Sequence, residues 1–138
     1  MTSFVSNKAS EYYTKFTTVA GEVSYTLTGV VVVEPPFQGQ GGDWFRERVQ
    51  FAVPVPSLAK GSQLKLIYWA PFVTLSSISN DRTATNAGWA VDGFGIASPK
   101  NLIGETVGVY CDLAVRDIDG FVVRLAYNVH LIGKEVRV

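Results

Sequence analysis

The sequence predicts an all-β protein: an antiparallel β-sandwich or jelly roll of about seven to eight strands that ends in a long hairpin. Glycine and proline punctuate the chain at short intervals, and β-branched and aromatic residues fill the stretches between them. No stretch of about eleven residues carries a helical apolar stripe. At 138 residues we expect one domain over residues 1–138, with an N-terminal arm at residues 1–10.

The hairpin is predicted from two long segments with alternating polarity. Apolar residues fall on every second position from Thr106 to Asp117 and again from Phe121 to Ile132. The three residues between them end in Gly120, as in a three-residue hairpin loop. This loop pairs Cys111 with Tyr127 and gathers both apolar sets on one face of one sheet.

Further strands are predicted where β-branched and aromatic residues run between turn signals. They are Tyr12–Val19, Glu22–Glu34, Phe45–Val53, Leu64–Ala70, Phe72–Ile78 and Trp89–Ile96. The first two are expected to pair across Ala20 and Gly21. Pro71 separates two of the others and predicts a bend or a sheet edge, because proline donates no ladder hydrogen bond.

The charge balance argues against a general nucleic-acid binder. Twelve Lys+Arg face twelve Asp+Glu, the net charge is zero, and the basic residues are scattered. No apolar run is long enough for a spanning helix, and the start has no apolar core of a signal peptide. The single cysteine forms no intrachain disulfide. We therefore expect a protein of the cytoplasm, or of a particle assembled there.

Catalysis is not expected, because the chain holds one histidine and no nucleophile motif around a serine. In the predicted register His130 and Cys111 point to opposite faces and form no dyad. No residues stand at metal-ligand spacing, and the glycine-rich stretch at 38–43 lacks the lysine and helix of a phosphate loop. We expect no enzyme, no metal and no cofactor.

Two polar loops offer a binding site instead. Trp44 follows the glycine-rich stretch, and Trp89 follows a loop over residues 77–86 that is rich in Ser, Asn and Asp. A tryptophan beside short polar side chains suits a sugar ring, which offers C–H groups and hydroxyls together. The prediction is a non-enzymatic, oligomeric module that binds a glycan or cell-surface ligand. Its expected hydrogen-bonding residues are Asp43, Asn80, Asp81, Arg82 and Asn86.

The alternative is a self-assembling structural subunit of a virion, a tail or another protein shell. Charged residues make up 17% of the chain, below the usual 25% or so, and apolar residues fall on faces predicted to be outward. Apolar surface of this kind usually marks subunit contact, so a homo-oligomer is expected. The predicted interface residues are Ile67, Trp69, Val122 and Ile132.

Overall fold

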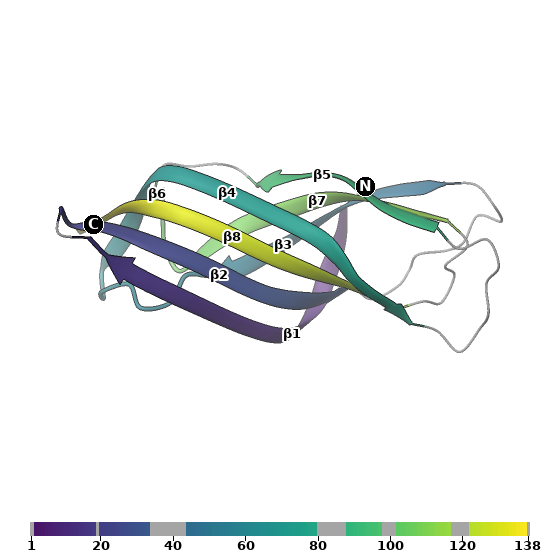
Figure 1. Ribbon diagram of the computed structural model, residues 1–138, viewed down its shortest axis with the longest axis horizontal. Coiled ribbons are helices and arrows are strands. Elements are labelled where there is room, and N and C mark those ends of the chain that lie inside the picture. The colour runs from purple at the N-terminus through teal and green to yellow at the C-terminus, as the bar shows by residue number, and fades with distance from the viewer. Residues whose placement is uncertain are drawn as a thin grey trace.

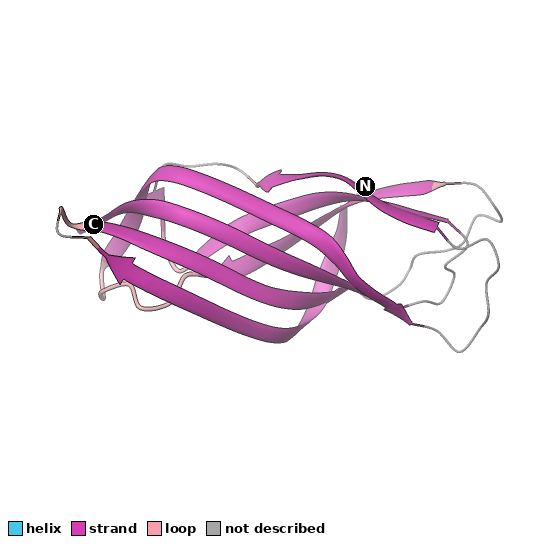
Figure 2. Cartoon of the chain, viewed as in Figure 1, coloured by secondary structure: helices cyan, strands magenta, loops and turns pink. Residues whose placement is uncertain are grey.

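A computed structural model describes residues 2–18, 20–33, 44–79, 88–97, 102–116 and 122–137. These residues form eight strands and no helix, so the all-β prediction is confirmed (Figures 1 and 2). The strands are β1 (Thr2–Thr17), β2 (Glu22–Val33), β3 (Phe45–Pro54), β4 (Ser62–Ser79), β5 (Gly88–Ile96), β6 (Leu102–Ile103), β7 (Thr106–Arg116) and β8 (Val122–Arg137).

The strands form two layers that share β1, as in a β-sandwich. Sheet A has the order β5-β7-β3-β1, and sheet B continues as β1-β2-β8-β4-β6 (Figure 1). The start of β1, Thr2–Phe4, runs parallel to β3, and the rest of β1 pairs antiparallel with β2. Residues 2–10, where an arm was predicted, are therefore the first half of a strand. Apart from that short parallel stretch, the described pairings are antiparallel.

The core lies between the sheets and follows from the alternation in the sequence. In β2, every second residue from Val23 to Val33 is buried, and the residues between them are half-buried. Val49 and Phe51 of β3 and Tyr127 of β8 are buried from opposite layers. The rings of Phe51 and Tyr127 stack with centroids 5.6 Å apart, which joins sheet A to sheet B across the core.

The β1–β2 hairpin is confirmed, but the predicted pairing of β7 with β8 is wrong. Both strands form, yet β7 pairs with β3 and β5, whereas β8 pairs with β2 and β4. Cys111 lies opposite Val49 in sheet A, and Tyr127 lies opposite Gly29 and Val73 in sheet B. Alternation assigns the faces of each strand but not its partner, and two apolar faces are buried equally well across a sandwich. The predicted loop at 118–120 lies outside the described residues.

One long strand, β4, replaces the two that were predicted around Pro71. Pro71 lies opposite Val129 of β8, and β6 covers the other edge of β4 only at Leu64 and Lys65. Within the described residues Pro71 therefore lies on a sheet edge, where its missing N–H costs no ladder bond. A β-bulge at Ile67 shifts the register between Leu66 and Tyr68, and this shift reverses the predicted faces of the residues that follow.

Candidate functional site

Of the residues predicted to bind a ligand, the structure describes Trp44 and Trp89. The predicted hydrogen-bonding residues lie outside the described part of the chain; they are Asp43, Asn80, Asp81, Arg82 and Asn86. The two tryptophans are 42% and 51% exposed. Both lie at the same end of sheet A, because Trp44 precedes β3 and Trp89 opens β5, and both strands begin beside the end of β7.

The two tryptophans nevertheless lie on opposite faces of sheet A. The Trp44 ring covers Gly88, where a Cβ would meet it at 2.9 Å, and the Arg116 guanidinium lies 5.0 Å from the ring centroid. Trp89 alternates in phase with Val91, which pairs with the buried Leu113. The two rings therefore cannot stack on one sugar ring as a single platform.

The outer face of sheet A carries charges that are paired within the sheet. Arg48 donates two hydrogen bonds to Asp112, at 2.8 and 3.1 Å, and its guanidinium lies 4.2 Å from the Tyr110 ring centroid. These hydrogen bonds lower the pKa of the Asp112 carboxyl group. Arg46 likewise donates to Asp92 at 3.2 Å. Because its arginines are already engaged, this face is a poor site for an anionic ligand.

The outer face of sheet B is different, since it carries no Asp, Glu, Lys or Arg over three successive rows of four strands. We define this face by the twelve residues that the register of β1, β2, β8 and β4 aligns in these rows. They are Phe16, Ser24, Ile132 and Tyr68; Thr14, Thr26, His130 and Ala70; and Tyr12, Thr28, Asn128 and Phe72.

Hydroxyl, amide and imidazole groups occupy the middle of this face, and aromatic rings stand at its corners. Thr26 Oγ1 and His130 Nδ1 are hydrogen-bonded at 3.2 Å, and the Tyr68 ring meets the His130 ring edge-on at 6.3 Å. The rings of Tyr12, Phe16 and Tyr68 are 71%, 68% and 51% exposed. They can therefore receive a ligand without any rearrangement of the core.

Charges border this face rather than cross it. The next row toward one end holds Glu22, Lys134 and Lys65. Beyond the other end, Arg124 follows in β8. The arrangement suits a flat, uncharged ligand that offers C–H groups to the rings and hydroxyls to the polar centre.

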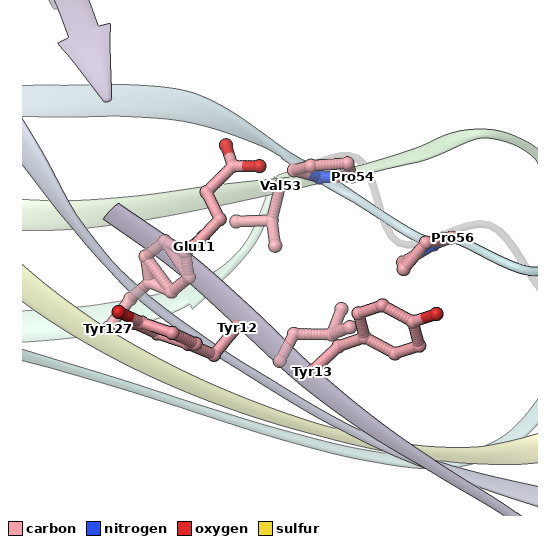
Figure 3. A pocket seen from close by; sticks show the side chains of 8 residues that line it. Glu11, Tyr12, Tyr13, Val53, Pro54, Pro56 and Tyr127 are labelled. Carbon is pink, nitrogen blue, oxygen red and sulfur yellow. The ribbon is translucent and has the colours of Figure 1, made fainter. Parts of the chain in front are cut away.

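A small cleft opens beside this face, between β1 and the end of β3 (Figure 3). Its volume is ≈ 240 Å³, and we call it the tyrosine cleft. Eight residues line it: Glu11, Tyr12, Tyr13, Leu27, Val53, Pro54, Pro56 and Tyr127. Glu11 reaches toward Val53 and Pro54, and the ring of Tyr13 lies beside Pro56 (Figure 3).

Polar contacts fix the wall of the tyrosine cleft. The Lys15 ammonium lies 2.6 Å from both Glu135 Oε1 and the Ser57 carbonyl oxygen. The Tyr13 and Ser57 hydroxyls are hydrogen-bonded at 2.8 Å, and Tyr25 donates to the Pro56 carbonyl at 2.8 Å. Burial alone would lower the pKa of Lys15, but the hydrogen bonds and charges of Glu135 and Tyr25 together outweigh it, and the pKa is raised. The segment after β3 is thus held against β1 and β2.

The two residues considered for catalysis lie far apart in the architecture. Cys111 is buried in sheet A, and this burial raises the pKa of its thiol to about 12. His130 lies on the outer face of sheet B. Within the described ranges, no three His, Cys, Asp or Glu side chains gather as metal ligands. Nor does any described segment form an apolar helix of membrane-spanning length.

The predicted interface residues fall on two surfaces. Ile67, at the bulge, is 56% exposed, and Trp69, which the bulge turns toward the interior, is still 37% exposed. Ile132 lies on the outer face of sheet B, and the side chain of Val122 lies outside what the structure describes. Farther along β4, a groove of ≈ 390 Å³ separates β4 from β5, where Phe72 and Phe94 meet edge-to-face at 5.2 Å.

Sequence reasoning missed the aromatic residues of β1 as functional candidates. The alternation of Tyr12, Thr14 and Phe16 is visible in the sequence, but their partners on β8 and β4 are not. Glu47 was also missed: it is 6% exposed and points into the sandwich. Alternation places it in phase with Val49 and Val53, but a charged side chain is not expected in a core.

Comparison with known proteins adds no relative. No protein-family model matches the chain, and no curated protein or solved structure is significantly similar to it. The class that the fold defines is a β-sandwich.

Proposed function

We propose that this protein is a non-enzymatic binding module for an uncharged glycan, and that the ligand lies on the outer face of sheet B. The observation that carries the proposal is the composition of that face: twelve aligned positions without a charged side chain, with exposed aromatic rings at the corners. The class of ligand is the one predicted from the sequence, but the proposed surface is new.

The chemistry of the face favours a polysaccharide over other partners. Sugar rings stack their C–H faces on aromatic side chains, and their hydroxyls exchange hydrogen bonds with groups such as Thr26, Asn128 and His130. A polyanion or a polycation would find no opposite charge here. Each ring contact is individually weak, so binding to several sugar units at once would supply the affinity.

The proposal is tested by retention on a panel of insoluble neutral polysaccharides: cellulose, chitin, xylan and mannan. We expect retention on at least one of them, lost in the double variant Phe16→Ala/Tyr68→Ala. Both side chains are more than half exposed, so their truncation should leave the fold intact. Retention by none of the four polymers would count against the proposal.

The matched control is Trp44→Ala/Trp89→Ala, which also removes two exposed aromatic side chains. If the ligand lies on the outer face of sheet B, this variant should bind as the unaltered protein does. If it loses binding while Phe16→Ala/Tyr68→Ala retains it, the ligand lies at the loop end of sheet A, where the sequence alone predicted it.

A self-assembling structural subunit is the second candidate, favoured by the open side between β4 and β5. In the described residues, neither β5 nor the stretch of β4 beyond Lys65 has a strand partner on this side, and Ile67, Trp89 and Phe94 are exposed along it. Unpaired edges with apolar side chains favour association between chains. Light scattering should then give a large closed particle or a polymer, which Ile67→Asp should dissociate.

A further inference from the structure

We infer that the tyrosine cleft binds a single sugar unit that branches from a polysaccharide chain lying on the outer face of sheet B. The inference rests on the proposed function, and it narrows the ligand to a neutral polysaccharide with side branches of one sugar. Three observations carry it: Tyr12 belongs to both surfaces, the cleft lies over a free strand edge, and its volume suits one sugar unit.

Tyr12 joins the cleft to the proposed glycan surface. It stands opposite Thr28 at one corner of the outer face of sheet B, and it also lines the tyrosine cleft (Figure 3). Its side chain is 71% exposed, so most of the ring is open to a ligand. A ligand at this corner of the face therefore lies at the mouth of the cleft.

The cleft leads away from the face, over the edge of β1. In the described pairings β1 joins β3 only at Thr2–Phe4, so β1 has a free edge at Tyr12 and Tyr13. Tyr13 points to the other side of the strand, because it lies opposite the buried Leu27. An extended chain on the outer face passes this edge, whereas a side branch can turn over it into the cleft.

The size and lining of the cleft suit one sugar ring. At ≈ 240 Å³ the cleft is smaller than the roughly 300–1,000 Å³ of sites for drug-sized ligands, so the branch is one unit long. The rings of Tyr12 and Tyr13 offer aromatic surface to the C–H groups of a sugar, and phenolic hydroxyls both donate and accept hydrogen bonds. The buried side chains of Leu27 and Val53 close the cleft toward the core.

The wall of the cleft is fixed before a ligand arrives. The hydroxyls of Tyr13 and Ser57 are hydrogen-bonded at 2.8 Å, and the Lys15 ammonium donates to the Ser57 carbonyl oxygen at 2.6 Å. These bonds hold the segment after β3 against β1. A site that is already formed needs little ordering on binding, so even one sugar unit can add measurable affinity.

The test is a calorimetric titration of the full chain with pairs of oligosaccharides that differ only in one branch. The pairs are cellotetraose with and without a xylose branch, mannopentaose with and without a galactose branch, and xylotetraose with and without an arabinose branch. We expect the branched member of at least one pair to bind at least about tenfold more tightly than the unbranched member. Affinities within about threefold in all three pairs would overturn the inference, as would no binding of any branched member.

Failure of this inference can be told apart from failure of the proposed function. If the unbranched members bind, lose affinity in Phe16→Ala/Tyr68→Ala and gain nothing from a branch, the outer face of sheet B binds the glycan and the cleft does not. Retention by none of the insoluble polysaccharides would contradict the proposed function and this inference together.

Variants locate the branch. Tyr13→Ala removes a wall of the cleft and leaves the outer face of sheet B intact, so it should bind the branched member no more tightly than the unbranched one. Its affinity for the unbranched member should stay within about threefold of the unaltered protein, which also shows that the variant is folded. Tyr13→Phe is the matched control: it keeps the ring, loses only the hydroxyl bond to Ser57, and should retain the preference for the branch. A preference that survives Tyr13→Ala would contradict the assignment of the branch to the cleft.

Discussion

Glu47 is the only charged side chain that the described part of the sandwich buries, and it sits among apolar neighbours. Glu47 lies opposite Leu113, and Val49 is the next inward-facing residue along β3. No described group donates a hydrogen bond to Glu47 Oε1. A buried polar atom without a partner costs about 1–3 kcal/mol. The buried Glu47 side chain therefore lowers the free energy of unfolding.

Glu47→Gln is expected to raise the free energy of unfolding by about 1 kcal/mol, because it keeps the shape and removes a carboxylate that is costly to bury. Urea denaturation measures the change. Gln50→Glu is the control, since Gln50 is exposed on the same strand and the change should stay within about 0.5 kcal/mol. A loss of 2 kcal/mol or so in Glu47→Gln would show instead that the carboxylate is needed.

At the scale of single elements, the bulge in β4 depends on Gly133 of β8. A Cβ at this position would run into the Lys65 carbonyl oxygen and lie 3.1 Å from Leu64 Cδ1. Gly133 pairs with Leu66, directly before the register shift. The missing side chain thus allows β4 to approach β8 closely where Ile67 is extruded, and this bulge decides which residues of β4 reach the outer face of sheet B.

Gly133→Ala is expected to lower the free energy of unfolding by about 2–3 kcal/mol, because a strand backbone has to move to admit the methyl group. Gly104→Ala is the matched control: nothing lies within 4 Å of its Cβ position, so its effect should be within about 0.5 kcal/mol. Thermal melting of the two variants compares them. Equal melting temperatures would mean that β4 does not pack against Gly133 as described.

Most strands could be predicted from the sequence, but their partners could not. Alternation identified β2, β7 and β8, and the turn at Gly21 identified the β1–β2 pair. The β7–β8 pair failed because both apolar faces point into one core from opposite sheets. Trp69 was assigned to the wrong face, because nothing in a run of apolar residues indicates where a β-bulge occurs.

The candidate site was harder to predict than the fold, because it depends on which strands are neighbours and in what register they pair. The outer face of sheet B assembles Phe16, Ser24, Ile132 and Tyr68 from four strands in one row. Each of them alone reads as an ordinary surface or core residue. Their common lack of charge becomes visible only when the register is known.

On the scale of the whole molecule, the buried ionisable groups make the fold sensitive to alkali. Burial raises the pKa of Cys111 from 9.0 to about 12 and the pKa of Tyr127 from 10.0 to about 12. The native state therefore holds these protons more tightly than the unfolded chain. Their contribution is complete below pH 9 and is lost as the pH rises from 9 toward 12.

The free energy of unfolding should fall by roughly 3–4 kcal/mol between pH 8 and pH 11, since each proton released only on unfolding contributes about 1.4 kcal/mol per pH unit. Urea denaturation at pH 8, 9, 10 and 11 measures this slope. In Cys111→Ala the decline should begin near pH 10 rather than near pH 9. A flat profile through pH 11 would contradict the burial of both groups.

The most direct test of the central claim compares the affinity of the unaltered protein and of Phe16→Ala/Tyr68→Ala for the polysaccharide that retains the protein. Binding isotherms are measured at about 50 and 500 mM salt, which separates contacts with the uncharged face from contacts between charges. We predict at least tenfold weaker binding of the variant, and an affinity of the unaltered protein that does not change with salt. Binding by the variant within about threefold of the unaltered protein, or binding lost at high salt, would contradict the proposed role of the outer face of sheet B.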